Sequence, residues 1–263
     1  MTDLQEVIRD LNAEGDDVDR LVADLAPEQW SLPTPAPGWT IKHQIAHLIF
    51  IFRLAGTAAS DAEAFQQIIA GVGDDFDGAV NAALAQYLDE PPEKLLAQWR
   101  SERAATAEAL AAVPPDQTVP WLVRPLPPAI LACAGIMELF GHGQDIADAL
   151  GAERERTDRL RHLAGFAVLT RDFGYHARGL TPPEEEFRFE LTSPSGESWE
   201  FGPAEAEQRV TGPAVDFCLL VTRRRHRDDL ALTASGAKAD HWLDIAQAYR
   251  GPAGPGRSPG QFA

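Results

Sequence analysis

The segment Ala129–Leu150, AILACAGIMELFGHGQDIADAL, is the feature that most constrains the fold, because it puts polar groups on the apolar face of a helix. At about 100° per residue, Glu138, His142 and Asp145 fall within roughly 60° of one another, on a stripe shared with apolar residues. Burying such groups without partners is costly. A metal ion bound by Glu138 and His142 would offset that cost, and the alternative is a direct i,i+4 pair or a wet helix edge.

A second helix carries another candidate ligand. The run WSLPTPAPGW at 30–39 contains three prolines and a glycine, so we predict a tight loop there. Thr40 is then a natural N-cap for a helix in which His47 shares a stripe with His43 and apolar residues. For an isolated histidine, a core residue bonded to a backbone carbonyl is the simpler interpretation. A second buried-looking histidine therefore appears on a second predicted helix.

Helical spacing of apolar residues continues through the first half of the chain, with a possible kink at Gly15. Pro127 and Pro128 precede the helix that carries Glu138, and Gly151 follows it as a C-cap. Four long helices with long connections pack as a bundle, whose sites face the shared core. We predict principal helices at roughly 3–26, 40–58, 92–113 and 128–150, with shorter ones at 61–72 and 76–88.

The character of the sequence changes after Gly151, and we predict a four-helix bundle at 1–152 followed by an α+β domain at 153–263. The strands FRFELTS and SWEFG flank a Pro-Ser-Gly turn. The tail GPAGPGRSPGQFA is either an ordered strap or a frayed end. The remaining predicted elements are a helix at 158–175, a strand at 208–211, a helix from Gly212 to Arg224, a strand LALTAS at 230–235 and a last helix at 239–249.

Composition narrows the function classes. The net charge of −17 argues against a nucleic acid or an anionic membrane as partner. Cys133 and Cys218 are the two cysteines, and we see no signal peptide and no apolar run of the ~20 residues that a membrane span needs. We therefore expect a cytoplasmic protein with reduced thiols, present as a monomer or homodimer.

The run PGWTIKHQIAHL, followed about ninety residues later by MELFGHGQDIADALG, resembles the DinB-like metal-binding bundles. The likeness is to the mycothiol-dependent maleylpyruvate isomerase type, which has a small C-terminal α+β domain. The runs VTGPAVDFCLLVTRRRHRDDL and ADHWLDIAQAYRGPAGPGR are similar to an actinobacterial subgroup described as metal-binding. By motif, the resemblance implies that His47, Glu138 and His142 hold the metal. His43 stands where relatives often have aspartate, so we expect it behind the ligands or in packing.

Two imidazoles and one carboxylate suit Zn²⁺, with Ni²⁺, iron or manganese as alternatives. Three protein ligands leave a coordination position open, and the resemblance implies that mycothiol occupies it as a thiolate.

We expect Asp145 to orient His142 or to receive a substrate proton, and the alternative is a solvated acid at the helix end. Cys133 is predicted to be a packing residue.

The run from Arg223 to Arg227 is the one concentrated positive charge in this acidic sequence. One explanation is compensation of a helix dipole and pairing with nearby acidic residues. The resemblance instead implies that one of Arg223, Arg224 and Arg225 faces the metal and binds a substrate carboxylate.

These observations lead to one main hypothesis, a zinc enzyme that uses a low-molecular-weight thiol on a small electrophilic metabolite. The reaction would be thiol transfer or thiol-dependent isomerisation. The alternatives are a hydrolase or lyase that uses metal-bound water, and a non-catalytic metal-binding protein. Enzymatic activity that depends on a thiol would distinguish the main hypothesis from a hydrolase or lyase that uses metal-bound water.

Overall fold

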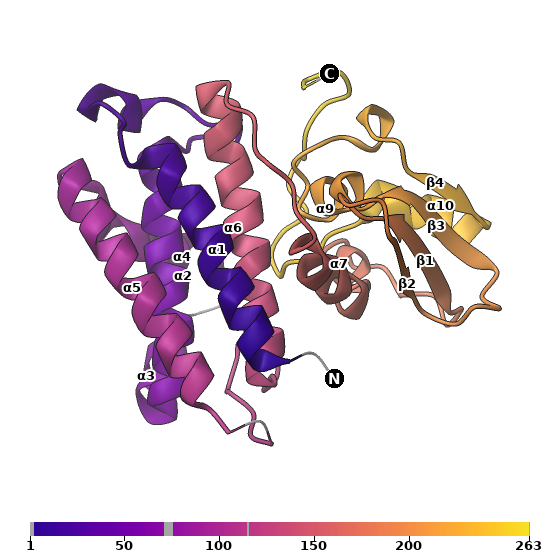
Figure 1. The fold of residues 1–263 in the computed structure, drawn as a ribbon, viewed down its shortest axis with the longest axis horizontal. Helices are drawn as coiled ribbons and strands as arrows, with labels where there is room; N and C mark the ends of the chain where they lie inside the picture. The colour runs from indigo at the N-terminus through magenta and orange to yellow at the C-terminus, as the bar shows by residue number, and fades with distance from the viewer. Residues whose placement is uncertain (1–2, 71–75, 115, 263) are drawn as a thin grey trace. The chain divides into compact units, whose positions relative to one another are not determined.

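A computed structural model describes residues 3–70, 76–114 and 116–262 (Figure 1). Its contacts divide the chain into two compact units, Met1–Arg154 and Glu155–Ala263. The first is a bundle of helices and the second combines helices with a small sheet, which confirms the predicted fold class. That the units are separate domains with a boundary at 152 stays a prediction. In the described residues no helix combines the length and apolarity needed to span a bilayer.

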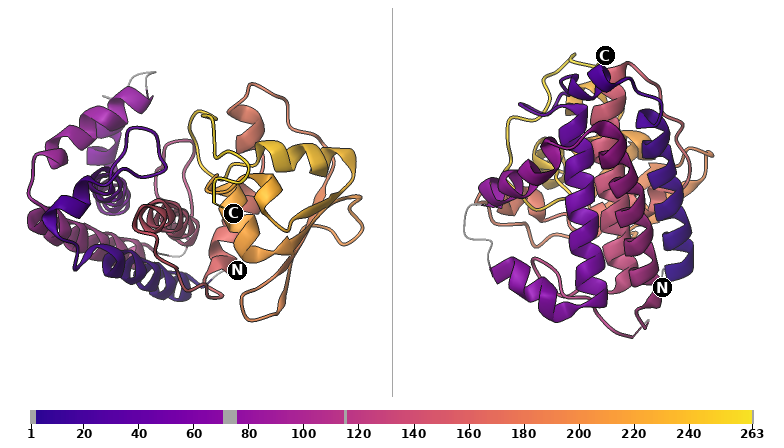
Figure 2. Two further views of the ribbon diagram at one scale, coloured as in Figure 1. Left: turned by 90° about the horizontal axis from the view of Figure 1, so that it is seen from above. Right: turned by 90° about the vertical axis from the view of Figure 1, so that its left-hand side faces the viewer.

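Unit 1 is built on four long helices whose bounds lie close to the predicted ones. In the two views of Figure 2 they run side by side, and α2 packs against both α5 and α6 while α1 packs against α5 and α6. This arrangement turns one face of α6 toward α2 and another toward α1. The four helices are α1 (Leu4–Val22), α2 (Ile41–Ser60), α5 (Pro92–Ala112) and α6 (Pro128–Leu150).

Glycines on α6 let α1 approach closely. A Cβ at Gly135 would lie 2.9 Å from Leu11 Cδ1, and a Cβ at Gly143 would lie 2.9 Å from Val18 Cγ2. Gly151 ends α6 at φ 63°, as expected for a left-handed C-cap. Because α1 occupies the glycine face, the face of α6 that carries the polar residues is left for α2.

The short elements of unit 1 follow the predicted pattern with adjusted ends. A 3-10 helix, η1 (Pro27–Ser31), follows α1, which ends earlier than predicted. Helices α3 (Ala62–Ala70) and α4 (Phe76–Leu88) occupy the predicted positions, and the last part of the segment predicted at 61–72 lies outside the described residues.

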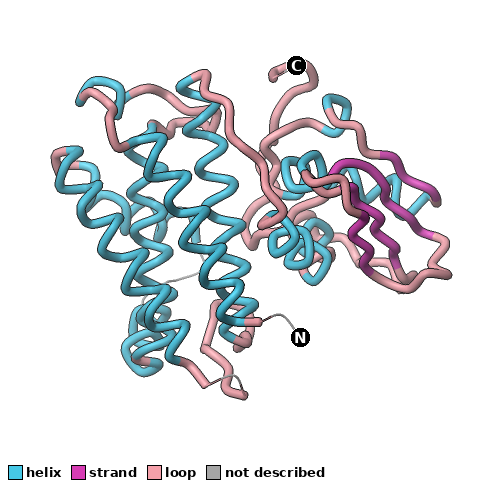
Figure 3. Tube along the Cα trace, viewed as in Figure 1, coloured by secondary structure: helices cyan, strands magenta, loops and turns pink. Residues whose placement is uncertain are grey.

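Unit 2 contains a four-stranded sheet of order β2-β1-β3-β4, and Figure 3 shows the strands in this part of the chain. The predicted hairpin is confirmed, with Phe189 opposite Phe201 and Gly196 at φ 91° in its turn. Strand β1 pairs in parallel with β3, and β3 pairs antiparallel with β4. The strands are β1 (Phe187–Thr192), β2 (Ser198–Phe201), β3 (Gln208–Pro213) and β4 (Thr233–Ser235).

Four predicted elements of unit 2 were wrong in extent, among them the last helix, which was predicted at 239–249 and runs from Ala237 to Ile245. The single helix predicted at 158–175 is two helices, and the Thr170 hydroxyl at the break donates 2.9 Å to Phe166 O and 3.2 Å to Ala248 O. The strand predicted at 230–235 is paired only at 233–235. The helix predicted to reach Arg224 ends at Val221, because Arg223 turns to φ 59°. The helices are α7 (Leu160–Leu169), α8 (Phe173–His176), α9 (Ala214–Val221), the 3-10 helix η2 (Arg227–Asp229) and α10 (Ala237–Ile245).

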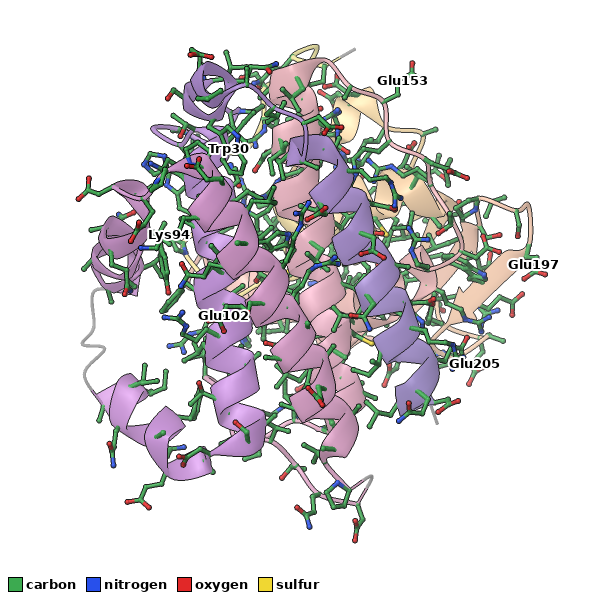
Figure 4. The ribbon with its side chains drawn as sticks, turned by 60° about the vertical axis from the view of Figure 1, so that its left-hand side comes forward. Trp30, Lys94, Glu102, Glu153, Glu197 and Glu205 are labelled. Carbon is green, nitrogen blue, oxygen red and sulfur yellow. The ribbon has the colours of Figure 1, made fainter. Side chains whose placement is uncertain are left out.

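The acidic character predicted from composition is visible at the surface. Figure 4 labels Glu153, Glu197 and Glu205, whose side chains point outward, and all three are exposed. An exposed negative surface repels polyanions in general.

The first prediction concerns the close packing of α8. A Cβ at Gly174 would lie 2.1 Å from Ile245 O, whereas a Cβ at Gly165 in α7 would find its nearest atom 3.6 Å away, at Phe201 Cε1. We expect Gly174→Ala to lower the free energy of unfolding by about 1–3 kcal/mol through overpacking. Gly165→Ala should leave it unchanged or raise it by up to about 1 kcal/mol, since alanine favours helix. Urea unfolding of the full chain tests this, and equal effects of the two changes would contradict it.

Candidate metal centre

Three side chains from two helices meet inside unit 1. His47 comes from α2, and Glu138 and His142 lie one turn apart on α6. Both imidazoles approach the same carboxylate oxygen, with His47 Nε2 3.4 Å and His142 Nε2 3.2 Å from Glu138 Oε2. The three potential ligand atoms lie within 4.8 Å of one another. The structure thus brings together the three residues that the sequence motifs singled out as metal ligands, and it shows more than a single i,i+4 pair.

The proline-rich loop before α2 positions the first of these residues. Thr34 N donates 2.8 Å to Trp39 O, and Ile41 N donates 3.1 Å to Leu32 O, so the loop closes on itself. Thr40 then precedes α2 as its N-cap residue. The loop therefore fixes where α2 begins, and with it the position of His47, about two turns further along the helix.

A buried glutamine orients His142. Gln44 on α2 is fully buried, and its Oε1 lies 2.5 Å from His142 Nδ1. Its amide Nε2 donates 2.8 Å to Thr34 Oγ1, whose hydroxyl donates 2.9 Å to Trp39 O. Because the amide oxygen can only accept, His142 Nδ1 carries a proton, and Nε2 is the nitrogen that faces Glu138. Sequence analysis missed Gln44, although its place one turn before His47 was a usable signal.

Trp39 and His43 lie beside the three residues without belonging to them. The Trp39 ring is 5.5 Å from the His47 ring and 5.9 Å from the His142 ring, centroid to centroid. His43 Nδ1 accepts a hydrogen bond of 3.2 Å from the backbone N–H of Thr40, so this side chain caps the N-terminal end of α2. Burial, with the nearby charge of Lys42, lowers the pKa of His43. Sequence analysis also missed Trp39 as a site residue, although its position at the end of the loop before α2 was a usable signal.

The electrostatics of the three residues suit a cation. Burial raises the pKa of Glu138, but hydrogen bonds and charges from His142 and His47 together outweigh it, and the net pKa lies well below the ordinary value. The carboxylate is therefore ionised at neutral pH. Nδ1 of His47 is buried and has no hydrogen-bond partner in the described residues, so the protein does not fix its tautomer as it does for His142.

The donor set fits a divalent metal ion. Two imidazole nitrogens and one carboxylate oxygen are ligands that Zn²⁺ accepts, and Ni²⁺, iron and manganese use the same types. The side chains of His47, Glu138 and His142 are 14%, 21% and 13% exposed, so the site is sheltered but reachable. These three residues are the ones that could hold an ion here.

Two other residues of α6 were discussed from sequence. Asp145 is fully buried one turn beyond His142, and it is not one of the three clustered ligands. His142 Nδ1 donates its hydrogen bond to Gln44 Oε1, and the role predicted for Asp145 stays a prediction. Cys133 is buried, and burial raises the pKa of its thiol to about 12. It therefore stays protonated and packs as an apolar residue.

The three arginines predicted to act on substrate follow α9 in unit 2. Arg224 Nη1 donates 2.5 Å to Thr222 O, and Arg225 places its guanidinium 4.3 Å from the centroid of the Phe262 ring. Arg223 Nη2 donates 3.3 Å to Gly254 O. That one of these arginines binds a substrate carboxylate stays a prediction.

The first unit is a helical bundle in which two histidines and a glutamate converge between α2 and α6, and comparison with known proteins shows the family to which it belongs. A family model described as the mycothiol maleylpyruvate isomerase N-terminal domain matches residues 11–147, just over half of the chain. The chain therefore belongs to this family. A second model, described as wyosine base formation, matches residues 183–235 in unit 2.

Among individual proteins, the chain is similar to two of Mycobacterium tuberculosis that are described as uncharacterized, MT0041 of strain CDC 1551 / Oshkosh and Rv0036c of strain ATCC 25618 / H37Rv. Each is 46% identical over 257 residues, which span 98% of this chain and 100% of the relative. Crystal structures of the mycothiol-dependent maleylpyruvate isomerase and of a histidine-to-alanine mutant of it share the fold. For both, the TM-score is 0.60 at 17% identity, over 89% of this chain and 93% of the other.

The second prediction is that the purified protein holds about one divalent ion per chain and loses it when a ligand is removed. His47→Ala, Glu138→Ala and His142→Ala should each lower metal content strongly by elemental analysis. His43→Ala is the matched control, because its Nδ1 bonds to Thr40 instead. Full metal content in all three variants, or loss in His43→Ala alone, would rule out this set of ligands.

The third prediction isolates the hydrogen bond from His142 to Gln44. Gln44→Leu removes the acceptor, so we expect a loss of ~10–100-fold in metal affinity, the usual cost when the partner of a metal-binding histidine is removed. Gln44→Glu keeps an acceptor oxygen at the same position and should retain most of the affinity. Competition with a chelator of known affinity measures both variants. An unchanged affinity in Gln44→Leu would show that the hydrogen bond does not orient His142 for binding.

Proposed function

We propose that this protein is a metal-dependent enzyme, with zinc as the metal, that uses a low-molecular-weight thiol such as mycothiol on a small electrophilic metabolite. The reaction is thiol transfer or thiol-dependent isomerisation. The observation that carries the proposal is the convergence of His47 Nε2 and His142 Nε2 on one ionised oxygen of Glu138. The name of the matched family supports the choice of thiol.

The protein's own cysteines support an external thiol. The chain has two, Cys133 and Cys218, and both are buried. A thiol acts as a nucleophile only as the thiolate, and a pKa of about 12 keeps Cys133 protonated at neutral pH. A sulfur nucleophile at this site must therefore come from a cosubstrate. A divalent ion held by the three ligands would supply the Lewis acidity that lowers the pKa of such a thiol.

The residues around the ligands have separate tasks in this proposal. Gln44 holds the His142 ring in the tautomer that points Nε2 at the site. The Trp39 ring lies beside both histidines and keeps water away from one side. Glu138 contributes the negative charge that a divalent cation requires. Asp145 is assigned to proton transfer. One of Arg223, Arg224 and Arg225 is assigned to a carboxylate of the substrate.

The proposal extends to the setting of the reaction. A small-molecule substrate and a thiol are the partners, the enzyme acts in the cytoplasm, and neither nucleic acid nor a membrane is needed. The acidic surface supports this choice of partners, because it repels polyanions.

The fourth prediction tests the thiol directly. In the zinc-loaded protein, mycothiol should raise the free energy of unfolding by RT ln(1 + [L]/Kd), which is about 2.7 kcal/mol at one hundred times Kd. An analogue that lacks the sulfur should give little of this effect, and so should mycothiol with the His142→Ala variant. Thermal unfolding measures all three.

Calorimetry adds an independent readout for the same prediction. A thiol that binds as a thiolate releases its proton, so the apparent heat of binding should change with the ionisation enthalpy of the buffer. A folded, zinc-loaded protein that shows neither stabilisation by the thiol nor proton release would refute the thiol and leave water activation as the leading account.

A further inference from the structure

Arg223 occupies a backbone position that usually belongs to glycine. Helix α9 ends in a Schellman motif, in which Arg224 N donates 2.8 Å to Leu219 O and Arg223 N donates 2.8 Å to Leu220 O. Arg223 is the left-handed residue of that motif, at φ 59°. Within the described residues it is the one non-glycine residue with positive φ. Such a conformation is strained for a side chain with a Cβ, and an observed outlier of this kind points to a function for the side chain.

The guanidinium of Arg223 lines a cavity of about 280 Å³ that lies entirely within unit 2. Five arginines line this cavity, together with His226. Asp244 is the one acidic residue in the lining, and its carboxylate accepts 2.7 Å from Arg227 Nη1. The cavity therefore carries a large excess of positive charge inside an acidic protein. The five arginines are Arg178, Arg223, Arg225, Arg227 and Arg257.

Arg223 has unused hydrogen-bonding capacity at this place. A guanidinium has five N–H donors, and in the described structure the Arg223 side chain makes one hydrogen bond, from Nη2 to Gly254 O at 3.3 Å. Nη1 is buried and has no hydrogen-bond partner among the described residues. Burial lowers the pKa of Arg223, and the charges of Arg257 and Arg224 lower it further, while Tyr249 acts in the opposite sense. An anion would satisfy these donors and relieve the repulsion.

The glycine-rich tail forms one wall of the cavity and holds Arg223 in place. Gly256 has φ 71°, which favours glycine, and a Cβ there would lie 2.7 Å from Arg223 Nη2, so the backbone of the tail approaches the guanidinium closely. Gly260 N donates 2.8 Å to Asp229 Oδ1, which fastens the tail to η2. Of the two alternatives that composition left open for the tail, the structure shows the ordered strap.

We propose that this cavity is a binding site for a small metabolite with an oxyanion group, a carboxylate or a phosphate, and that Arg223 is its main contact. A planar guanidinium can bind either group through two parallel hydrogen bonds. Arg178, fixed by hydrogen bonds from Nη1 to Gly174 O and Ile245 O, adds a second positive charge. Leu220, Leu243 and Ala246 give the cavity an apolar side for a short carbon skeleton. The site is formed by unit 2 alone, and so the proposal does not depend on the metal or the thiol.

The fifth prediction uses inorganic phosphate and succinate as probes on the full-length protein as purified. Each is titrated against sodium chloride of equal ionic strength, with thermal unfolding and calorimetry as readouts. We expect a saturable rise in melting temperature with at least one probe. Arg223→Gln should weaken that binding at least tenfold. Arg161→Gln removes the same charge from an exposed position on α7 and should bind like the natural protein.

A second variant separates binding from folding. Arg223→Gly places at φ 59° the residue that adopts this conformation without strain, so its melting temperature in chloride should equal or exceed that of the natural protein. Its response to the probe should nevertheless be lost.

Saturation with phosphate alone assigns the site to phosphate esters, and saturation with succinate alone assigns it to carboxylates. No saturable binding, or equal binding by Arg223→Gln and Arg161→Gln, would overturn the proposal. The response to the probe should persist in the His142→Ala variant, and its loss there would place the binding at the metal centre instead.

Discussion

The carboxylate of Glu138 is the group on which the architecture of unit 1 most depends. An ionised carboxylate inside a helical bundle is strongly unfavourable unless it has partners. Here the partners are two imidazoles from two helices, and their hydrogen bonds hold the pKa of Glu138 below its ordinary value in spite of burial. The contact of both imidazoles with one carboxylate requires α2 and α6 to lie side by side, with His47 at the same height along the bundle as Glu138 and His142. The glycine face of α6, which receives α1, leaves the polar face free for α2.

The loop before α2 has a larger part in the site than its composition suggested. Its prolines and its own hydrogen bonds fix Thr34 and Trp39. From the Trp39 carbonyl, a chain of hydrogen bonds passes through Thr34 and Gln44 to the His142 ring. A residue about one hundred positions earlier in the chain thus keeps a proton on His142 Nδ1 and turns Nε2 toward Glu138. His47 has no such partner in the described residues, so the two histidines are not equivalent.

Unit 2 concentrates positive charge in a protein with a net charge of −17. Sequence analysis noticed the run from Arg223 to Arg227, but Arg178 and Arg257 join it only through the fold. The ion pairs of Arg227 with Asp240 and Asp244 show that part of this charge is structural. Arg223 differs, because its backbone conformation disfavours a side chain and its donors are mostly unused. The same run of arginines therefore contains residues with different tasks.

Local signals in the sequence were sufficient for the helices of the bundle, for the hairpin and for the pair Glu138 and His142, whereas the family resemblance was needed to choose His47 over His43. Helical periodicity put Glu138 and His142 on one face, and Thr40 and Gly151 marked helix ends where α2 begins and α6 ends. They could not predict the break at Thr170, which depends on a hydrogen bond to Ala248, 78 residues away. They also could not identify Gln44 as a partner of His142, or bring the tail against Arg223, because long-range packing decides which polar groups meet. Local periodicity determines which face a residue occupies, but only the tertiary structure determines what that face contacts.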